Sequence, residues 1–284
     1  MKVAKTIKSI RNLVKAARSK GKKIGFVPTM GALHIGHISL IEAAVKKCDF
    51  VVVSIFVNPA QFGPGEDFEK YPRPLKTDLE ICRKAGVDVV FTPATKQMYP
   101  QENLTWVNAE KLTEQLCGQF RPGHFRGVTT VCAKLFNIVA PDIAFFGQKD
   151  AQQAIVIKRM VADLNMPVEI VVCPTVRHSD GLAVSSRNQY LTEQQRKDAT
   201  YVYKSLEECR KLINSGITDS KTIIAKMRKI LNQAPSIKIE YISIVDADTL
   251  QELKKITGKV LTAVAVKIGS TRLIDNIVVD AGER

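Results

Sequence analysis

Several features that mark other protein classes are missing from this chain of 284 residues. No apolar run reaches the roughly 20 residues that a transmembrane helix needs. The N-terminal lysines are not followed by the apolar core of a signal peptide. There is no internal repeat and no low-complexity segment. We therefore expect a soluble, cytoplasmic, globular protein with no membrane partner.

Cysteine is present without a cysteine motif. The six cysteines contain no C-x-x-C pair, and several lie in apolar periodic segments. This excludes a recognisable zinc or disulfide framework and predicts buried thiols in a reducing compartment. The cysteines are Cys48, Cys82, Cys117, Cys132, Cys173 and Cys209.

Aromatic residues make up only 6% of the chain and do not alternate with basic residues as in RNA-binding sheets. The net charge is nevertheless +14, from 42 basic and 28 acidic residues. The basic side chains are spread over helical faces, as at Lys8, Arg11 and Lys15, and form no long block. We expect solvated basic surfaces and no nucleic-acid partner, with a polyanionic partner as the alternative.

Apolar runs and amphipathic stretches alternate through the first part of the chain, which predicts βαβ units and a parallel sheet. The expected fold class is α/β, a Rossmann-like doubly wound parallel sheet in a domain spanning residues 1–175. The expected strands are 24–27, 50–57, 87–91, 143–146 and 168–173. The expected helices are 7–17, one after residue 37, 75–85, 112–116, 128–137 and one reaching residue 164.

The pattern changes near Val176, where a polar segment precedes a long amphipathic stretch. Thr192 and Gln195 have the spacing of a capping box that starts this helix. We expect a smaller α+β domain over residues 176–284, acting as a lid. Its other expected elements are a helix at 220–231, strands at 237–245, 260–268 and 272–279, and a helix near Leu250.

The segment FVPTMGALHIGH, residues 26–37, predicts a strand, a tight loop and a helix start. His34 and His37 are three residues apart and would share one helix face, with Gly36 leaving room beside them. A helix N-terminus with imidazole donors suits phosphate binding. The segment resembles the HIGH signature of the nucleotidyltransferase superfamily that includes class I aminoacyl-tRNA synthetases. Two ordinary surface histidines are the competing interpretation.

Other polar groups follow expected strands or precede expected helices. Lys149 would begin a helix after a strand, where an ammonium group can meet phosphate oxygens. The segment Ser185-Ser186-Arg187 could close over a triphosphate and stabilise departing pyrophosphate. Each alone is equally typical of a capped helix or a polar turn. Together with the double-histidine motif they predict a site for in-line phosphoryl transfer.

From end to end, the chain resembles the pantothenate synthetase (pantoate-β-alanine ligase) family, with the motifs in family order. The matching blocks are PTMGALHIGH (28–37), VNPAQF (57–62), RPGHFRGV (121–128), FGQKDAQQ (146–153) and DGLAVSSRN (180–188). The resemblance implies a magnesium-requiring ligase that uses ATP. Pantoate would first form a pantoyl adenylate with release of pyrophosphate, and β-alanine would then displace AMP. The resemblance also implies a homodimer.

The resemblance further assigns residues. His34, His37 and Lys149 would be catalytic, with His37 as a proton donor. Gln61 and Gln153 would bind pantoate, and Asn58, Arg121 and His124 are weaker candidates for the same side. The ATP-binding residues would be Met30, Gly31, Ala32, Leu33, His34, Ile35, Gly36, His37, Gly147, Gln148, Lys149, Asp150, Val176, Val184, Ser185, Ser186 and Arg187.

This chain departs from the family pattern at Gln148, Ala151 and Val184, where the family usually has glutamate, an aromatic residue and methionine. Asp78 could help to hold magnesium, but we expect an ordinary surface aspartate on a helix and assign no protein ligand to the metal. A nucleotidyltransferase that lacks the amine step is the alternative enzyme. Gln61 and Gln153 suit a hydroxy acid better than a phosphorylated substrate, which would call for more arginines.

Overall fold

The structure is a computed structural model that describes residues 1–282, so residues 283 and 284 of the predicted second domain lie outside the described residues. The chain divides into two compact units, which are described separately below. The first comprises Met1–Thr113, Gly118–Gln148 and Gln153–Pro174, and the second comprises Glu114–Cys117, Lys149–Gln152 and Thr175–Arg284. The predicted domain boundary at residues 175 and 176 stays a prediction.

The first unit contains a parallel sheet, as the alternating pattern predicts. Its strand order is β1-β4-β3-β2-β5-β6. The strands are β1 (Lys2–Ala4), β2 (Ile24–Thr29), β3 (Phe50–Ile55), β4 (Val89–Phe91), β5 (Ile143–Gly147) and β6 (Glu169–Cys173). The predicted α/β class with a parallel sheet is confirmed.

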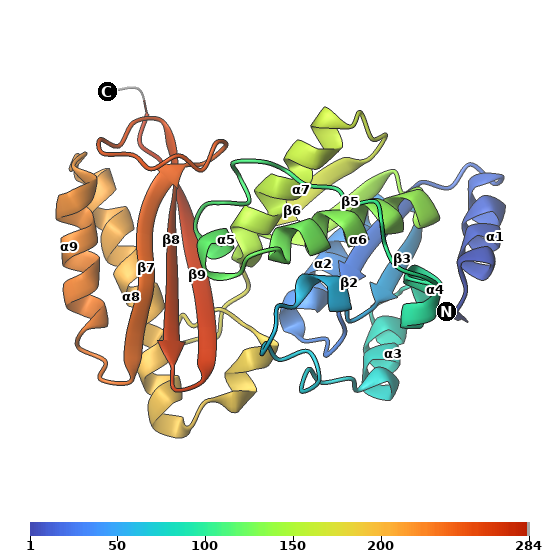
Figure 1. Cartoon of the computed structure of the whole chain (residues 1–284), viewed down its shortest axis with the longest axis horizontal. Helices are drawn as coiled ribbons and strands as arrows, with labels where there is room; N and C mark the ends of the chain where they lie inside the picture. Colours follow the sequence, from blue (N-terminus) through green and yellow to red (C-terminus); the bar gives the residue numbers. More distant parts are fainter. Residues whose placement is uncertain (283–284) are drawn as a thin grey trace. The chain divides into compact units, whose positions relative to one another are not determined.

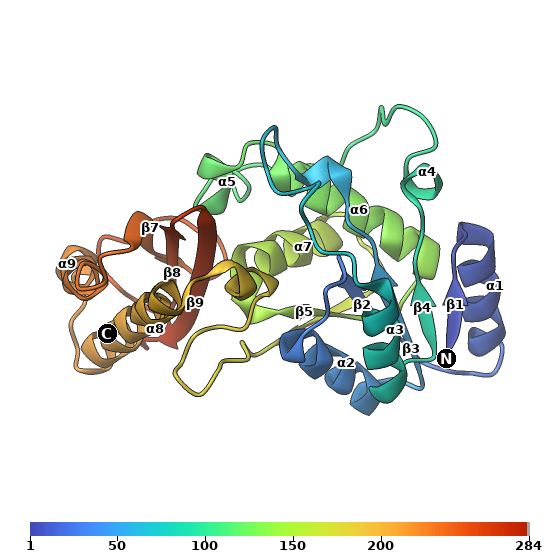
Figure 2. The same cartoon turned by 90° about the horizontal axis from the view of Figure 1, so that it is seen from below.

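Helices cover both faces of this sheet, and the central strands are buried on both sides. Phe26 packs in a core with α1, α6 and α7, whereas its neighbour Val27 packs in a second core with α2 and α3. Figure 2 shows α6 and α7 on one side of the strands and α2 and α3 on the other. The helices are α1 (Ile7–Arg18), α2 (Ile35–Lys47), α3 (Leu75–Lys84), α4 (Thr95–Met98), α6 (His124–Val139) and α7 (Ala151–Asp163).

The chain order reverses between β2 and β5. From β2 the chain moves outward through β3 to β4, and β5 then pairs with the opposite edge of β2, with Gly25 opposite Ile143 and Phe26 opposite Ala144. In doubly wound sheets, ligands bind beyond the carboxyl ends of the strands at such a switch point. The loops that begin after Thr29 and Gly147 leave from this point.

The second unit consists of an antiparallel sheet, β7-β8-β9, packed against two helices. Figure 1 shows α8 and α9 beside these strands. The expected capping box is confirmed: Thr192 accepts the backbone N–H of Gln195, whose side chain accepts the N–H of Thr192. The elements are α5 (Cys117–Phe120, which begins in this unit), α8 (Glu193–Asn214), α9 (Ser220–Leu231), β7 (Ile237–Asp246), β8 (Lys259–Ile268) and β9 (Thr271–Asp280).

Two expected helices are wrong. Residues 112–116 form turns, because Leu116 has a φ of 47° that a helix does not allow, and the periodic Leu112 and Leu116 are simply buried in that conformation. Leu250 has a φ of 59° in a turn whose N–H groups are bound by the Asp246 carboxylate. Strand β1 was missed because only one of its three residues, Ala4, is buried.

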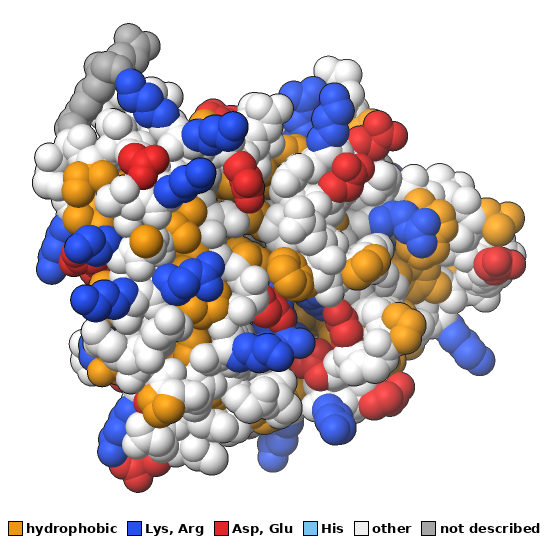
Figure 3. All heavy atoms as spheres, turned by 60° about the vertical axis from the view of Figure 1, so that its left-hand side comes forward, with side chains coloured by type: hydrophobic (Ala, Val, Ile, Leu, Met, Phe, Trp, Pro, Cys, Tyr) orange, Lys and Arg blue, Asp and Glu red, His pale blue; other side chains and the backbone are white. Residues whose placement is uncertain are grey.

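Two further expectations concern the surface and the thiols. On the face shown in Figure 3, lysine and arginine side chains are scattered among acidic and uncharged ones.

All six cysteines are free thiols, and all except Cys48 are buried, as expected. Within residues 1–282, no helix is long and apolar enough to cross a membrane.

Candidate active site

The loop after β2 is held in an unusual backbone conformation. Gly31 and Ala32 have φ values of 87° and 51°, both in the left-handed region. The Thr29 hydroxyl donates to the Ser54 carbonyl at 2.7 Å and accepts the Gly31 N–H at 3.2 Å. These bonds join the loop to β3 and turn consecutive backbone N–H groups toward one side.

Asp78 receives those N–H groups, which corrects the expectation of a surface aspartate. Its two carboxylate oxygens accept the N–H of Ala32 at 2.9 Å and of Leu33 at 2.8 Å, and the residue is 1% exposed. A Cβ at Gly31 would lie 2.9 Å from the carboxylate, so glycine is required there. Asp78 therefore anchors the loop to the first turn of α3.

The two histidines cap the helix that follows. His34 is the N-cap of α2, and its Nδ1 accepts the Gly36 N–H at 3.1 Å. The Nδ1 of His37 accepts the His34 N–H at 3.3 Å. A Cβ at Gly36 would lie 3.0 Å from the His34 ring, which explains the small residue between the histidines. The exposed Ile35 occupies the first helical position.

These caps determine the tautomer of each ring. Because Nδ1 accepts a hydrogen bond in both histidines, the proton of each neutral ring resides on Nε2. The ring centroids of His34 and His37 are 4.1 Å apart. The start of α2 therefore carries paired Nε2–H donors next to the positive end of the helix dipole, an arrangement suited to phosphate oxygens.

A second polar group follows β3. Asn58 caps the short 3-10 helix η1 (Pro59–Gln61), and its side-chain amide donates to the Gln61 side chain at 3.1 Å and to the Gly127 carbonyl at 3.2 Å. Gln61, 8% exposed, donates from Nε2 to the Met30 sulfur at 3.0 Å. The predicted pantoate residue Gln61 thus contacts the predicted ATP residue Met30.

Arg121 and His124 join this group at the start of α6. His124 Nδ1 lies 2.7 Å from the Gln61 carbonyl and therefore donates to it, while its Nε2 lies 3.1 Å from Arg121 Nη1 and accepts. Arg121 forms a two-point ion pair with Glu66 at 2.7 and 2.5 Å. Burial opposes ionisation of Glu66, but the hydrogen bonds and charge of Arg121 lower the pKa of that carboxyl below its ordinary value.

Three predicted residues lie on or next to β5 and α7 in the first unit. Gly147 ends β5, Gln148 follows it in the 3-10 helix η2 (Gln148–Asp150), and Gln153 lies in the first turn of α7 with a half-buried side chain. Gly147 follows the strand that pairs with β2, so it leaves the sheet at the switch point described above.

Lys149 and Asp150 belong to the second unit. The ammonium of Lys149 lies 3.4 Å from the Asp150 carboxylate, and the Lys149 main-chain carbonyl accepts a hydrogen bond from the Asn276 side chain at 2.9 Å. The ammonium of Lys149 is thus balanced by a neighbouring carboxylate.

A hairpin brings Val176 and Val184 together in the second unit. The Val184 N–H donates to the Val176 carbonyl at 3.0 Å, and Arg177 and Ala183 form an antiparallel bridge inside this pair. Both valines contribute backbone atoms, so the departure from methionine at Val184 leaves this contact intact. We call residues 176–184 the hairpin segment.

The serine and arginine triplet follows the hairpin segment directly. Ser185 caps the 3-10 helix η3 (Ser186–Tyr190), and its hydroxyl accepts the Arg187 N–H at 3.3 Å. Asn188 donates from its side chain to the Ala183 carbonyl at 3.0 Å. The triplet is therefore ordered against the end of the hairpin.

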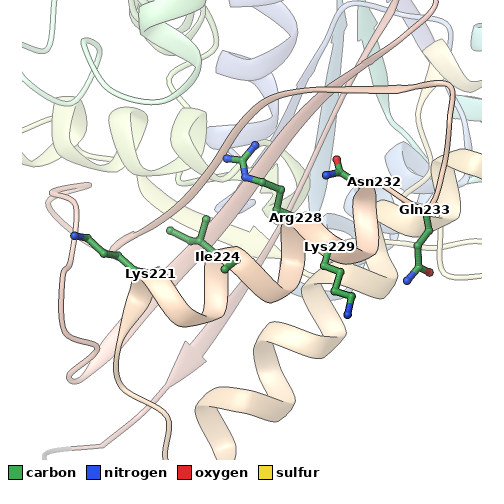
Figure 4. Close-up of a pocket in the computed structure, with 7 residues that line it drawn as sticks. Lys221, Ile224, Arg228, Lys229, Asn232 and Gln233 are labelled. Atoms are coloured by element: carbon green, nitrogen blue, oxygen red, sulfur yellow. The ribbon is translucent and has the colours of Figure 1, made fainter.

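A search for a metal site and a groove beside α9 add no further candidate to this site. No group of three or more histidine, cysteine or acidic residues within 1–282 could hold a metal ion. Figure 4 shows a groove beside α9, and none of its lining residues is one that we predict to bind ATP or pantoate. They are Lys221, Ile224, Ala225, Arg228, Lys229, Asn232 and Gln233.

Sequence reasoning missed Asp78 and Glu66 as parts of this architecture. An acidic residue in the first turn of a helix is the signal that marks Asp78, but it does not reveal which distant N–H groups the carboxylate meets. Glu66 lies in a loop rich in glycine and charge, with no periodic signal. Only the fold brings it to Arg121.

Comparison with known proteins places this architecture in one family. A family model described as pantoate-beta-alanine ligase matches residues 2–278. The chain is 58% identical over 277 residues to a pantothenate synthetase of Thermoanaerobacter pseudethanolicus, with 98% of each chain covered. It is 55% identical over 283 residues to that of Moorella thermoacetica, with 100% of both covered.

Solved structures agree. A pantothenate synthetase crystal structure from Thermus thermophilus matches with a TM-score of 0.93 and 43% identity, covering 98% of this chain and 99% of that one. A pantoate-beta-alanine ligase from Francisella tularensis, complexed with beta-gamma ATP and beta-alanine, matches with a TM-score of 0.81 and 38% identity, covering 98% and 97%.

Proposed function

Because this chain belongs to the pantoate-β-alanine ligase family, a family of enzymes that form a carbon–nitrogen bond, we propose that it condenses (R)-pantoate with β-alanine in two steps driven by ATP. The pantoate carboxylate attacks the α-phosphorus of ATP and pyrophosphate leaves. The amine of β-alanine then attacks the carbonyl of the pantoyl adenylate, loses a proton, and AMP leaves with the bonding electrons. The product is pantothenate.

The carboxylate must be activated because it is a poor electrophile, whereas a mixed anhydride with AMP has a good leaving group. No protein nucleophile is required, so catalysis consists of positioning and charge stabilisation. The ligand named for the Francisella tularensis structure, beta-gamma ATP with beta-alanine, supports both co-substrates.

The paired histidines are the observation that carries the proposal. His34 and His37 each have Nδ1 engaged by a backbone N–H, so each neutral ring carries its proton on Nε2 at the start of α2. We assign both donors to the ATP phosphates, and His37 to proton donation as charge develops on the leaving pyrophosphate. Asp78 accepts the N–H groups of Ala32 and Leu33 and so holds the loop 30–33, which immediately precedes the two histidines, in one conformation.

Gln61 and Gln153 are assigned to pantoate. A side-chain amide can donate to the carboxylate and accept from the hydroxyl groups of a hydroxy acid. Asn58, Arg121 and His124 hold Gln61 through its side chain and its carbonyl, so they support the pantoate side indirectly.

Residues 147–150, Val176 and residues 184–187 supply the remaining nucleotide contacts in this proposal. Lys149 meets phosphate oxygens, and Gly147, Gln148 and Asp150 flank it. The backbone of Val176 lies toward the adenine, and the segment Val184, Ser185, Ser186 and Arg187 stabilises the departing pyrophosphate.

Magnesium is proposed as the companion of ATP. Mg²⁺ usually keeps several waters and is bound through substrate phosphates and one or two carboxylates, not by a dedicated protein cage. The described residues offer no acidic cluster for it, and both oxygens of Asp78 already accept backbone N–H groups. The ion therefore fits as MgATP, where it neutralises phosphate charge.

We also propose a cytoplasmic location and a homodimer. Free cysteine thiols, most of them buried, support a reducing compartment. The dimer rests on family membership and is tested by sedimentation equilibrium.

The decisive experiment measures pyrophosphate release from MgATP with pantoate, first without and then with β-alanine, for the wild type and for His37→Ala. We expect pantoate to trigger a burst limited to one turnover, β-alanine to convert it to steady turnover with AMP release, and the variant to lose both. Glu42→Gln, an exposed change on the same helix, is the matched control and keeps both.

Either of two results would overturn the proposal. Folded wild-type protein that releases no pyrophosphate with pantoate is not a pantoate-activating enzyme. Pyrophosphate release that never leads to AMP release with β-alanine points instead to a nucleotidyltransferase without an amine step.

A further inference from the structure

Strand β9 carries two buried polar residues in an otherwise apolar stretch. Asp275 and Asn276 are each 4% exposed, between Ile274 and Ile277. A buried carboxylate or amide is costly unless hydrogen bonds satisfy it, so such a pair is retained for the partners it binds. Successive side chains of a strand point to opposite faces, which lets the two residues serve two different segments.

Asp275 holds the hairpin segment through Arg177. The guanidinium of Arg177 binds both oxygens of Asp275, at 2.6 and 3.0 Å, and also donates to the Gly181 carbonyl at 3.1 Å. The same group lies 3.9 Å from the centroid of the Tyr203 ring. Asp275 therefore fixes the base of the hairpin and, through Arg177, its tip.

The tip is tightly packed as well. Gly181 has a φ of 90°, and a Cβ there would lie 2.4 Å from the Tyr203 ring. The hairpin can therefore rest on α8 only with glycine at the tip. With both ends held, the backbone bond between Val176 and Val184 has a fixed position.

Asn276 holds the other segment. Its side-chain amide donates to the main-chain carbonyl of Lys149 at 2.9 Å. This bond lies one peptide from Asp150, whose carboxylate meets the Lys149 ammonium. The direction in which the Lys149 side chain leaves the backbone thus depends on an amide donor that an ionised aspartate would lack.

We propose that Asp275 and Asn276 are positioning residues for nucleotide binding, because β9 through them holds both the hairpin segment and the Lys149 backbone. This inference rests on the proposed function, in which Lys149, Val176 and Val184 contact ATP. Neither residue touches the substrate; each acts by holding segments that do. Prior ordering of such segments removes an entropy cost from binding.

The test compares Asn276→Asp and Asp275→Asn, which preserve side-chain shape, with Asn232→Asp and Asp248→Asn, the same chemical changes at exposed positions of the second unit. Equilibrium dialysis with MgATP alone gives the Kd for ATP, and steady-state assays give KM values for ATP and β-alanine. Thermal unfolding reports whether each variant is folded.

We expect Asn276→Asp to weaken ATP binding about tenfold, because a carboxylate then faces the Lys149 carbonyl. Asp275→Asn should weaken it by a similar factor, while the KM for β-alanine stays within about twofold of the wild type. Both control variants should bind ATP as the wild type does. Hydrogen exchange should rise in the hairpin segment for Asp275→Asn and around residue 149 for Asn276→Asp, which a general loss of stability does not produce.

The proposal is overturned if the folded Asp275 and Asn276 variants bind ATP with wild-type affinity. It is also overturned if these variants lose affinity for ATP and for β-alanine by the same factor. If either variant fails to fold, Asn276→Ser and Arg177→Lys, which each keep a donor, are measured in its place by the same criteria. The dialysis experiment uses ATP without pantoate. A wild type that binds ATP but does not activate pantoate therefore contradicts the proposed reaction, while the ATP affinities of the variants still test the role of Asp275 and Asn276.

Discussion

The imidazole rings of His34 and His37 lie 4.1 Å apart between centroids, each with Nδ1 bound to a backbone N–H of the same helix start. The two rings therefore cap the start of α2 and, in the proposed function, also donate from Nε2 to the ATP phosphates. Because of this double role, a mutation that removes an imidazole combines two effects, loss of a helix cap and loss of the proposed phosphate contact.

Replacement of His34 by asparagine should separate them. Asparagine is a good N-cap, so His34→Asn is expected to unfold at nearly the wild-type temperature. It lacks the Nε2–H donor, so the rate of pyrophosphate release with pantoate should fall on the order of 10²-fold to 10³-fold. Stopped-flow pyrophosphate assays and calorimetry give the two values. A full-rate enzyme would show that His34 is a cap alone.

Asp78→Asn should damage the loop without affecting metal binding. The amide can accept only one of the two N–H groups, so we expect a loss of about 1–3 kcal/mol in the free energy of unfolding, measured by urea denaturation, and a higher KM for ATP. Glu80→Gln, exposed on the same helix, is the control. Added magnesium should leave the defect unchanged; recovery of activity at high magnesium would mean that Asp78 does bind the ion.

Gln61→Ala should act on pantoate. We expect the KM for pantoate to rise about tenfold or more, because the hydrogen-bonding amide is lost from a buried site, while the KM for ATP changes little. Steady-state kinetics with each substrate varied in turn checks this split, with the exposed Gln101→Ala as control. An increase confined to the KM for ATP would remove Gln61 from the pantoate side.

The ion pair of Glu66 with Arg121 predicts a pH dependence of stability. Burial raises the pKa of Glu66, but Arg121 more than compensates, so the folded-state pKa lies below the ordinary value of 4.5. The pair's contribution is therefore complete above 4.5 and is lost as the pH falls through the lower folded-state pKa. Urea denaturation of the wild type and Glu66→Gln should show a steeper acid loss in the wild type. Parallel pH profiles would contradict this.

Thiol reactivity should follow burial. Burial raises the pKa of Cys82 and Cys132 to about 12, so both stay protonated at neutral pH. We expect Cys48, half-buried, to react first with a thiol reagent in the native protein, and all six to react in denaturant. Mass spectrometry of partially labelled protein identifies the order.

Local signals predicted much of this fold. The continuous apolar run of β3 indicated a strand buried on both faces, and Val52 and Val53 indeed lie in different cores. The Thr192 and Gln195 capping box marked the start of α8. Helix α9 begins and ends where the pattern predicts, because its apolar period is regular and Asp219 caps it.

The failures have a common physical cause. Leu112, Leu116 and Leu250 are apolar at helical spacing or near it, yet left-handed residues and side-chain-capped turns bury them without a helix. The spacing of apolar residues predicts which side chains are buried, but more than one backbone conformation can bury the same side chains. Local sequence therefore predicts burial better than it predicts these short elements.

Parts of the candidate site were also beyond local reasoning. Asp78 meets Ala32 across 46 positions of the chain, and Asp275 meets Arg177 across 98. No periodicity encodes such pairings, since they exist only after the sheet has assembled. The motif residues could be predicted from the sequence, whereas the distant residues that hydrogen-bond to them could not.

The hydrogen bonds made by β9 also impose an order on the synthesis of the chain. Asn276 follows Lys149 by 127 positions and Asp275 follows Arg177 by 98, so a ribosome makes both segments long before it makes their anchors. A nascent chain that already displays the double-histidine loop lacks the strand that holds the Lys149 backbone and the hairpin. These segments, which we propose to contact ATP, acquire their fixed positions only when translation has passed β9.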